Sequence, residues 1–387
     1  MISRSKFMAT IMIALFLGLV AVLITSQHTI VSASGAAASM PGPSQFYAQH
    51  NLLSDVPGLA DRTDPNVANA WGLDAGDTSP WWIADNGTGK TTLYNVAGGN
   101  VVTTFTVPGA GGAQGNPTGL VFNGGPGFVV NNGVGTSAAR FIFSSEDGTI
   151  SAFRGNPIVT VVPNANAPAH GAIYKGLAID SRTMGTHLYA TDFHNGKVDV
   201  FDTSFHLVTL SGNFTDPNLP AGFAPFGIQT IGNTLYVTYA LQDTAAEDEV
   251  AGPGNGFVDS YDLNGNFIRR VASMGELNAP WGLALAPSDF GRFSGDLLVG
   301  NFGDGRIHAF DPTTLTSTGE FEAVGLLHSE RGRPIQIDGL WALEFGHGTT
   351  AVGANGLTTT LFFTAGPFDE EHGLFGSIVL TEPPGRQ

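Results

Sequence analysis

Cysteine is absent from this 387-residue sequence. Its absence excludes disulfides, thiolate metal sites, haem attached through cysteine and a cysteine nucleophile. Charged residues are also scarce, at 13% of the chain, which is about half the share found in typical soluble domains. With 42% hydrophobic residues and no cross-links, the chain must be stabilised by a large buried core, and its length is sufficient to form one.

Basic residues are few as well, with 16 Lys and Arg against 33 Asp and Glu, and they form no cluster. Binding to nucleic acid or to anionic lipid requires grouped positive charge, so neither is expected as a partner. The partners that stay open are a small molecule, a glycan or a protein surface. A membrane would be contacted only through the N-terminal segment described next.

Long hydrophobic runs are missing except for one, which extends from Phe7 to Ile24. It follows Arg4 and Lys6 and precedes a stretch of small and polar residues that contains Val31-Ser32-Ala33. This order predicts a signal peptide over residues 1–38, although the run is long enough to serve as an uncleaved anchor. We therefore expect an extracytoplasmic or secreted protein, with a linker over 39–45, one domain over 46–380 and a polar tail over 381–387.

Glycine is abundant, at 53 residues, and part of it recurs in a fixed pattern. A variable residue, then Gly, then Leu or Ile opens an apolar run six times, at spacings of 47 to 60 residues, with Ala in place of Gly in the last copy. Further apolar runs and a Gly-containing turn follow each copy, most clearly in 188–202 and 297–311. Four short strands repeated six times predict an all-β fold, a six-bladed β-propeller. The copies are Trp71-Gly72-Leu73, Thr118-Gly119-Leu120, Lys175-Gly176-Leu177, Phe226-Gly227-Ile228, Trp281-Gly282-Leu283 and Trp341-Ala342-Leu343.

The sixth repeat contains only three apolar runs before the chain ends, the last being Leu374–Val379. An unpaired edge there would invite aggregation, and β architectures usually remove such edges by closure. We expect the alternating segment Phe46–Leu53 to supply the missing strand and close the ring; the alternative is an ordered arm packed elsewhere. In the second repeat an extra run, Phe128–Val130, leaves the register open.

The repeats resemble those of NHL-type propellers, in which Asp-x-x-x-Gly-x-Ile/Val leads into the second half of a blade. More closely, four blocks are similar to a family of uncharacterised exported bacterial proteins. The resemblance covers about Phe46 to Val379 and implies a six-bladed propeller, but no activity; Ala342 departs from the Gly usual in the family. The blocks are Tyr47–Leu52, Pro80–Gly89, Ala251–Asp259 and Gly300–Ile307.

Candidate site residues lie in two sets of loops that should open on one face of a propeller. These are the loops before each innermost strand and those between the second and third strands. Their oxygen-bearing side chains suit Ca²⁺, and Asp192 and Asn301 are the best candidate ligands because they match in the two best-aligned repeats. Equally, Asp and Asn are the residues that tight turns require, and the tryptophans suit a core as well as a stacking surface. The candidates are Trp71, Asp85, Asn86, Glu146, Asp147, Asp192, His194, Trp281, Asn301, Asp304 and Trp341.

No catalytic motif is present: the sequence contains neither His-Glu-x-x-His nor Gly-x-Ser-x-Gly. We therefore assign no catalytic residue and leave open whether the protein is an enzyme. The leading hypothesis is a recognition module that presents one propeller face to a ligand. The alternative is a metal-dependent lactonase-like hydrolase or a quinone-cofactor oxidoreductase, which would need acid, amide or His groups converging in the channel.

Overall fold

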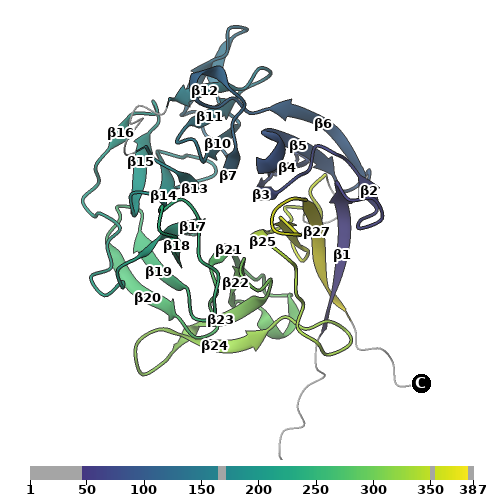
Figure 1. The fold of residues 1–387 in the computed structure, drawn as a ribbon, viewed down its shortest axis with the longest axis vertical. Helices are drawn as coiled ribbons and strands as arrows, with labels where there is room; N and C mark the ends of the chain where they lie inside the picture. Colours follow the sequence, from purple (N-terminus) through teal and green to yellow (C-terminus); the bar gives the residue numbers. More distant parts are fainter. Residues whose placement is uncertain (1–45, 164–170, 349–353, 382–387) are drawn as a thin grey trace, which may run out of the picture. The chain divides into compact units, whose positions relative to one another are not determined.

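The computed structural model describes residues 46–163, 171–348 and 354–381. The segment predicted as signal peptide or anchor, residues 1–38, lies outside the described residues, as do the linker and residues 382–387. No helix in the described part of the chain is long and apolar enough to cross a membrane. Six of the sheets that the described residues form are arranged in a ring, which confirms the six-bladed propeller (Figure 1).

The first five blades each contain four antiparallel strands. For each blade, the strands are given in order from the innermost, which lines the channel, to the outermost. Blade 1 contains β3 (Ala70–Asp74), β4 (Trp81–Asp85), β5 (Lys90–Asn95) and β6 (Asn100–Thr106); blade 2 contains β7 (Pro117–Phe122), β10 (Phe141–Ser145), β11 (Ile150–Phe153) and β12 (Val159–Val162). Blade 3 contains β13 (Tyr174–Ile179), β14 (His187–Asp192), β15 (Lys197–Asp202) and β16 (Leu207–Val208). Blade 4 contains β17 (Phe223–Ile231), β18 (Thr234–Leu241), β19 (Phe257–Asp262) and β20 (Phe267–Ser273); blade 5 contains β21 (Pro280–Leu285), β22 (Leu297–Asn301), β23 (Ile307–Leu315) and β24 (Phe321–Leu326).

Blade 6 joins the two ends of the domain. It contains β25 (Leu340–Phe345), β26 (Leu361–Ala365), β27 (Leu374–Thr381), β1 (Phe46–Ser54) and the short β2 (Arg62–Thr63). Strand β1 pairs antiparallel with β27, from Phe46 opposite Thr381 to Ser54 opposite Leu374, so the predicted closure is confirmed (Figure 1). The Tyr47 side chain is fully buried and its hydroxyl donates to the Phe290 carbonyl at 2.9 Å, which attaches the strand to blade 5 as well.

The extra run in the second repeat is not part of the blade. It falls in β8 (Val129–Asn131), which pairs with β9 (Thr136–Ala138) as a separate hairpin between β7 and β10. Three short 3-10 helices complete the elements: Asn86–Thr88, Ala110–Gly112 and Gly291–Phe293.

The recurrent glycine marks the place where neighbouring innermost strands approach most closely. A Cβ on Gly227 would lie 2.2 Å from the Trp281 carbonyl oxygen of the next blade, and one on Gly119 would lie 2.4 Å from the Leu177 nitrogen. Threonine in the second strand bridges the same junction: the Thr191 hydroxyl accepts from the Gly176 N–H at 2.6 Å and donates to the Phe226 carbonyl at 2.7 Å. The repeat therefore sets the spacing of the strands around the channel.

Candidate functional site

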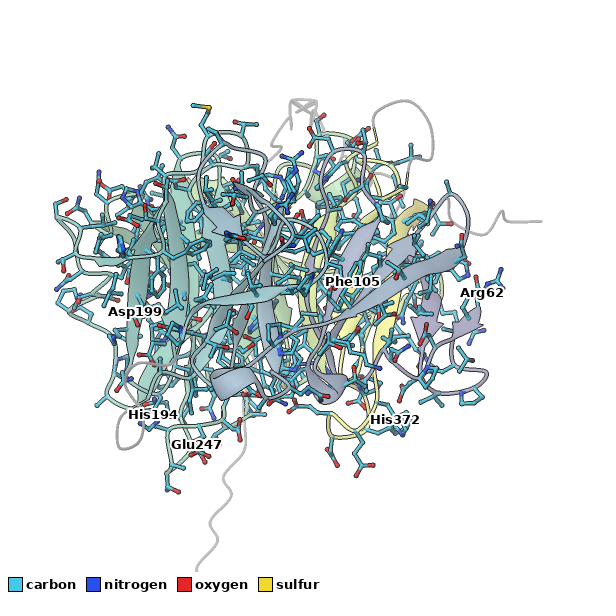
Figure 2. The ribbon with its side chains drawn as sticks, turned by 90° about the horizontal axis from the view of Figure 1, so that it is seen from above. Arg62, Phe105, His194, Asp199, Glu247 and His372 are labelled. Atoms are coloured by element: carbon cyan, nitrogen blue, oxygen red, sulfur yellow. The ribbon has the colours of Figure 1, made fainter. Side chains whose placement is uncertain are left out.

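The predicted loops define one end of the channel, called here the loop face. His194, Glu247 and His372 belong to loops between the second and third strands of blades 3, 4 and 6, and all three lie along the same lower edge in Figure 2. These loops therefore share one face, as the repeat predicts.

A hydrogen-bonded network joins several blades at the loop face. The Asn86 amide donates to Glu146 at 2.9 Å, and the Lys175 ammonium contacts Glu146 at 2.6 Å and Asp248 at 3.1 Å. Lys175 is only 1% exposed; burial alone would lower its pKa, but Glu146 and the other carboxylates nearby hold the pKa above its usual value. The structure thus brings together two predicted site residues, Asn86 and Glu146, around a buried, paired cation.

The three recurrent tryptophans close the channel beneath this network. The Trp71 and Trp341 rings stack with centroids 3.6 Å apart, and Trp281 meets Trp341 edge-on at 5.9 Å. The Lys175 ammonium lies 5.0 Å from the centre of the Trp71 ring, a cation–π distance. All three tryptophans are buried, so they form a core plug rather than an exposed stacking surface.

The other predicted site residues form hydrogen bonds within their own turns or with neighbouring strands and loops. Asp192 accepts from the Asn195 backbone and side chain, and Asn301 donates to the Glu276 carbonyl at 2.8 Å. The remaining side chains are similarly engaged: Asp85 accepts from Thr92 at 2.6 Å, Asp147 from the Ala110 N–H at 2.6 Å, Asp304 from the Arg306 N–H at 3.2 Å, and His194 Nδ1 lies 3.1 Å from the Ala246 carbonyl oxygen.

Asp192 and Asn301 belong to blades 3 and 5. Burial raises the pKa of Asp192 against the opposing effect of its Asn195 hydrogen bonds. Within the described ranges, the group of acidic and His side chains at metal-ligand spacing is a different one, Asp74, Glu344 and His347. Calcium binding by Asp192 and Asn301 stays a prediction.

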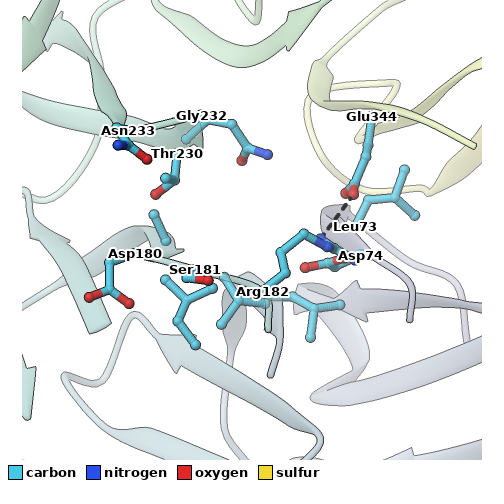
Figure 3. A pocket seen from close by; sticks show the side chains of 14 residues that line it. Leu73, Asp74, Asp180, Ser181, Arg182, Thr230, Gly232, Asn233 and Glu344 are labelled. Atoms are coloured by element: carbon cyan, nitrogen blue, oxygen red, sulfur yellow. Dashed lines mark hydrogen bonds and ion pairs between the residues drawn. The ribbon is translucent and has the colours of Figure 1, made fainter. Parts of the chain in front are cut away.

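Three cavities lie at the opposite end of the channel, called here the exit face, where the innermost strands end. An outer cavity of about 280 Å³ is bordered by those strand ends and the loops that follow them (Figure 3). Its polar lining includes Asp74, Asp180, Arg182, Thr230, Asn233 and Glu344, and in Figure 3 Asp180, Thr230 and Asn233 lie across the cavity from Glu344.

Sequence reasoning missed these residues, although a signal exists. The residue directly after each of the five Gly-Leu or Gly-Ile pairs, and after Ala342-Leu343 in blade 6, lies at this end of the channel, and all six such residues line the cavities there. Three are polar, namely Asp74, Gln229 and Glu344, and three are apolar. Because their chemistry does not repeat from blade to blade, a search for recurring residues passes over them.

Arg182 connects three blades across the exit face. It follows β13 in blade 3, and its guanidinium donates to Asp74 in blade 1 at 2.8 Å and lies 3.4 Å from the Glu344 carboxylate in blade 6 (Figure 3). Asp74 also accepts from the Phe122 N–H at 2.6 Å, and His347 Nε2 lies 3.1 Å from the same Glu344 oxygen.

Contact between Glu344 and His347 goes with raised pKa values for both groups. Burial, with the neighbouring Asp74 charge, raises the pKa of Glu344 to about 7. Burial lowers the pKa of His347, but its hydrogen bond and charge interaction with Glu344 outweigh this effect and raise the pKa overall. The ligand atoms of Asp74, Glu344 and His347 lie within 4.8 Å of one another, and Arg182 already contacts both carboxylates.

Two further cavities adjoin the first. A small inner cavity of about 30 Å³ shares Leu73, Leu120, Gln229 and Glu344 with the outer one and is also lined by Trp281. A third cavity, of about 300 Å³, again shares Gln229 and Glu344 and includes His347. Gln229 and Glu344 therefore stand where the three spaces meet.

Comparison with known proteins places the chain among viral proteins. No family model matches it. It is 34% identical over 335 residues to the uncharacterized protein R648 of Acanthamoeba polyphaga mimivirus, covering 84% of this chain and 78% of that protein, and 33% identical over 341 residues to protein L690 of the same virus, covering 85% and 84%. The chain belongs to the family of R648 and L690. The expectation of a bacterial protein is therefore wrong, because these family members point to a viral origin, and nothing in the comparison shows secretion.

Two solved structures with a fold similar to that of this chain are enzymes by name. Virginiamycin B lyase from Staphylococcus aureus is 14% identical, with a TM-score of 0.44 over 87% of this chain and 100% of the lyase. The luciferin-regenerating enzyme is 12% identical, with a TM-score of 0.48 over 81% and 92% of the two chains.

Proposed function

We propose that this protein is a recognition module that binds a small polar molecule in the outer cavity of the exit face. The observation that carries the proposal is the set of polar groups on the cavity wall that the protein leaves without partners. Among the described residues, no hydrogen bond involves the side-chain amides of Gln229 and Asn233, which both line this cavity. Apolar side chains such as Leu73, Leu120 and Val121 line the cavity as well, and small-ligand sites combine such contacts with placed polar groups.

The loop face supports this role less well. Its polar side chains bond to one another and its buried tryptophans stack in the channel, so these groups are already engaged within the protein.

A metal-dependent hydrolase would use Asp74, Glu344 and His347, whose spacing suits a metal ion. The Arg182 guanidinium contacts the carboxylates of Asp74 and Glu344, however. A metal ion would have to displace the Arg182 guanidinium from the same oxygen atoms and lie beside its positive charge, which is unfavourable. Ligand recognition is therefore the function that the contacts support better.

The test is to block the cavity mouth without disturbing the core. Asn233 is an exposed residue of the turn after β17, and the substitution Asn233→Phe would place a ring over the outer cavity. We expect ligand-observed NMR with a library of small neutral, cationic and anionic molecules to find binders of the wild type that this variant loses.

The matched control is Asn264→Phe, an exposed turn residue of the same blade that lines none of the exit-face cavities. Binders should persist in this control. A library without binders, or binders that Asn233→Phe retains, would contradict the proposal.

A further inference from the structure

Gln229 differs from the other polar residues of the exit face because its amide is unused. It lines all three cavities there and is half-buried, yet no hydrogen bond within the described residues involves its side chain. An amide without a protein partner keeps donor and acceptor groups for whatever occupies the cavity. The polar group of the ligand can therefore be inferred from Gln229.

The place of Gln229 in its blade indicates where its side chain points. Asp74, Gln229 and Glu344 hold the same place in their blades, one residue after the recurrent Leu or Ile, and each pairs with an aromatic residue of the second strand. Asp74 and Glu344 both reach the Arg182 guanidinium, at 2.8 Å and 3.4 Å, so side chains at this place extend over the channel. Because equivalent positions point the same way around a propeller, the Gln229 amide faces the outer cavity that all three residues line.

An amide fixes the geometry of the group that can satisfy it. Its C=O and one N–H lie side by side in one plane, which is how Asn and Gln form two parallel hydrogen bonds with the edge of adenine. A second amide matches this edge when its own C=O and N–H lie on the same side, as in a primary carboxamide or a lactam. In a trans peptide bond they lie on opposite sides, so only one of the two hydrogen bonds can form.

The charges around the outer cavity favour a neutral ligand. Among its lining residues, Asp74, Asp180 and Glu344 outnumber the single cation Arg182, which disfavours an anion. Arg182 lies against Asp74 and Glu344, so a cation that approached these two carboxylates would meet its positive charge.

From these observations we infer that the ligand is a neutral carboxamide or lactam, whose amide edge pairs with the Gln229 amide through two hydrogen bonds. Its carbon skeleton lies against Leu73, Leu120 and Val121, which line the same cavity. The cavity volume of about 280 Å³ is just below the roughly 300–1,000 Å³ of sites for drug-sized ligands, so the molecule is small. The inference rests on the proposed function, since it names the ligand class of that site.

The experiment compares five-carbon probes that differ in their polar group, by isothermal titration calorimetry on the wild type. Pentanamide and 2-piperidone carry the matching edge, N-methylbutanamide is a trans amide, pentanoate and pentylammonium are charged, and pentane-1,2-diol is a neutral rival. We expect pentanamide and 2-piperidone to bind, the trans amide to bind severalfold more weakly, and the charged probes to bind at least tenfold more weakly. The diol should also bind more weakly, because it must fix its torsion angles to present a donor and an acceptor together.

Gln229→Met keeps the length of the side chain and removes both hydrogen-bonding groups. We expect it to lower pentanamide affinity by about tenfold or more, which corresponds to the loss of two neutral hydrogen bonds. Gln229→Glu keeps acceptors but removes the donor, so the ligand carbonyl would meet a carboxylate and the affinity should also fall. The matched control is Gln336→Met, an exposed glutamine that lines none of the exit-face cavities, and its affinity should equal that of the wild type.

The other outcomes separate the two proposals. If the diol or pentylammonium binds best, or if pentanamide affinity is equal in the wild type and both Gln229 variants, the amide inference is wrong. The outer cavity then stays a ligand site as long as Asn233→Phe removes the binding. Equal affinities for N-methylbutanamide and pentanamide would overturn the edge pairing in the same way, as would a wider library whose binders Asn233→Phe loses while none of these probes binds. If no probe binds and Asn233→Phe changes nothing in the wider library, both proposals fail.

Discussion

At the scale of single residues, the structure separates turn-forming side chains from those that face a cavity. Asp192 and Asn301 occupy matching positions in their blades, and both bond to nearby backbone. Asp74 and Glu344 also occupy matching positions, and both line the outer cavity. In a propeller, equivalence of position decides where a residue lies, and only its chemistry and surroundings decide whether it serves the fold or a ligand.

Asp192→Ala tests the turn role against the calcium prediction. The Asn195 and Ile173 N–H groups would lose their acceptor, so we expect the free energy of unfolding to fall by about 1–3 kcal/mol. Because these bonds involve no cation, the loss should be equal in Ca²⁺ and in chelator, as measured by urea unfolding.

A smaller loss is expected for Asp304→Ala, whose side chain accepts from the Arg306 N–H in a more exposed turn. Should wild-type stability rise with Ca²⁺ while that of Asp192→Ala does not, Asp192 would be a calcium ligand after all.

At the scale of elements, the ring depends on one strand contributed from far away in the sequence. Strand β1 covers the edge of β27 and buries Tyr47 and Leu53 completely. Five blades are built from consecutive strands and could form locally, whereas blade 6 requires both ends of the domain to meet. Loss of this strand removes a ladder of hydrogen bonds and exposes a sheet edge at once.

Truncation through Leu53 should therefore cost several kcal/mol, because the hydrogen bonds to β27 and the buried Tyr47 side chain are lost together. Thermal unfolding of the truncated and full domains measures the effect. Gln49→Ala, in the same strand but exposed, is the control and should change the melting temperature little. An unchanged melting temperature after truncation would show that β1 is an accessory arm.

At the scale of the whole molecule, the buried carboxyl groups and the excess negative charge both lower the free energy of unfolding as the pH rises. Burial raises the pKa of Glu249 to about 8, and that of Asp259 and Glu344 to about 7. Each value lies above that of the unfolded chain, so folding favours the protonated form of these groups. Their contribution to stability is full at low pH and is lost as the pH rises through these values.

We therefore expect the free energy of unfolding to decrease between pH 5 and pH 8, as measured by urea titration at each pH. Growing repulsion among the acidic side chains, in a chain of formal net charge −17, adds to the decrease. Glu344→Gln should make the decrease shallower, because the amide does not titrate. Stability that is constant or increases over this range would contradict the assigned burial of these carboxyl groups.

The sequence by itself determined the architecture: the blade number, the closing strand and the positions of the close-packed glycines. These features are periodic or local, because each blade must present the same small residue to its neighbour and each sheet must pair its last edge. Only the tertiary structure decided where an open cavity lies. Asp74, Arg182 and Glu344 come from three blades and share no motif, and closure of the ring brings them into contact. Their proximity depends on distances between side chains across a channel, and no spacing along the chain encodes such distances.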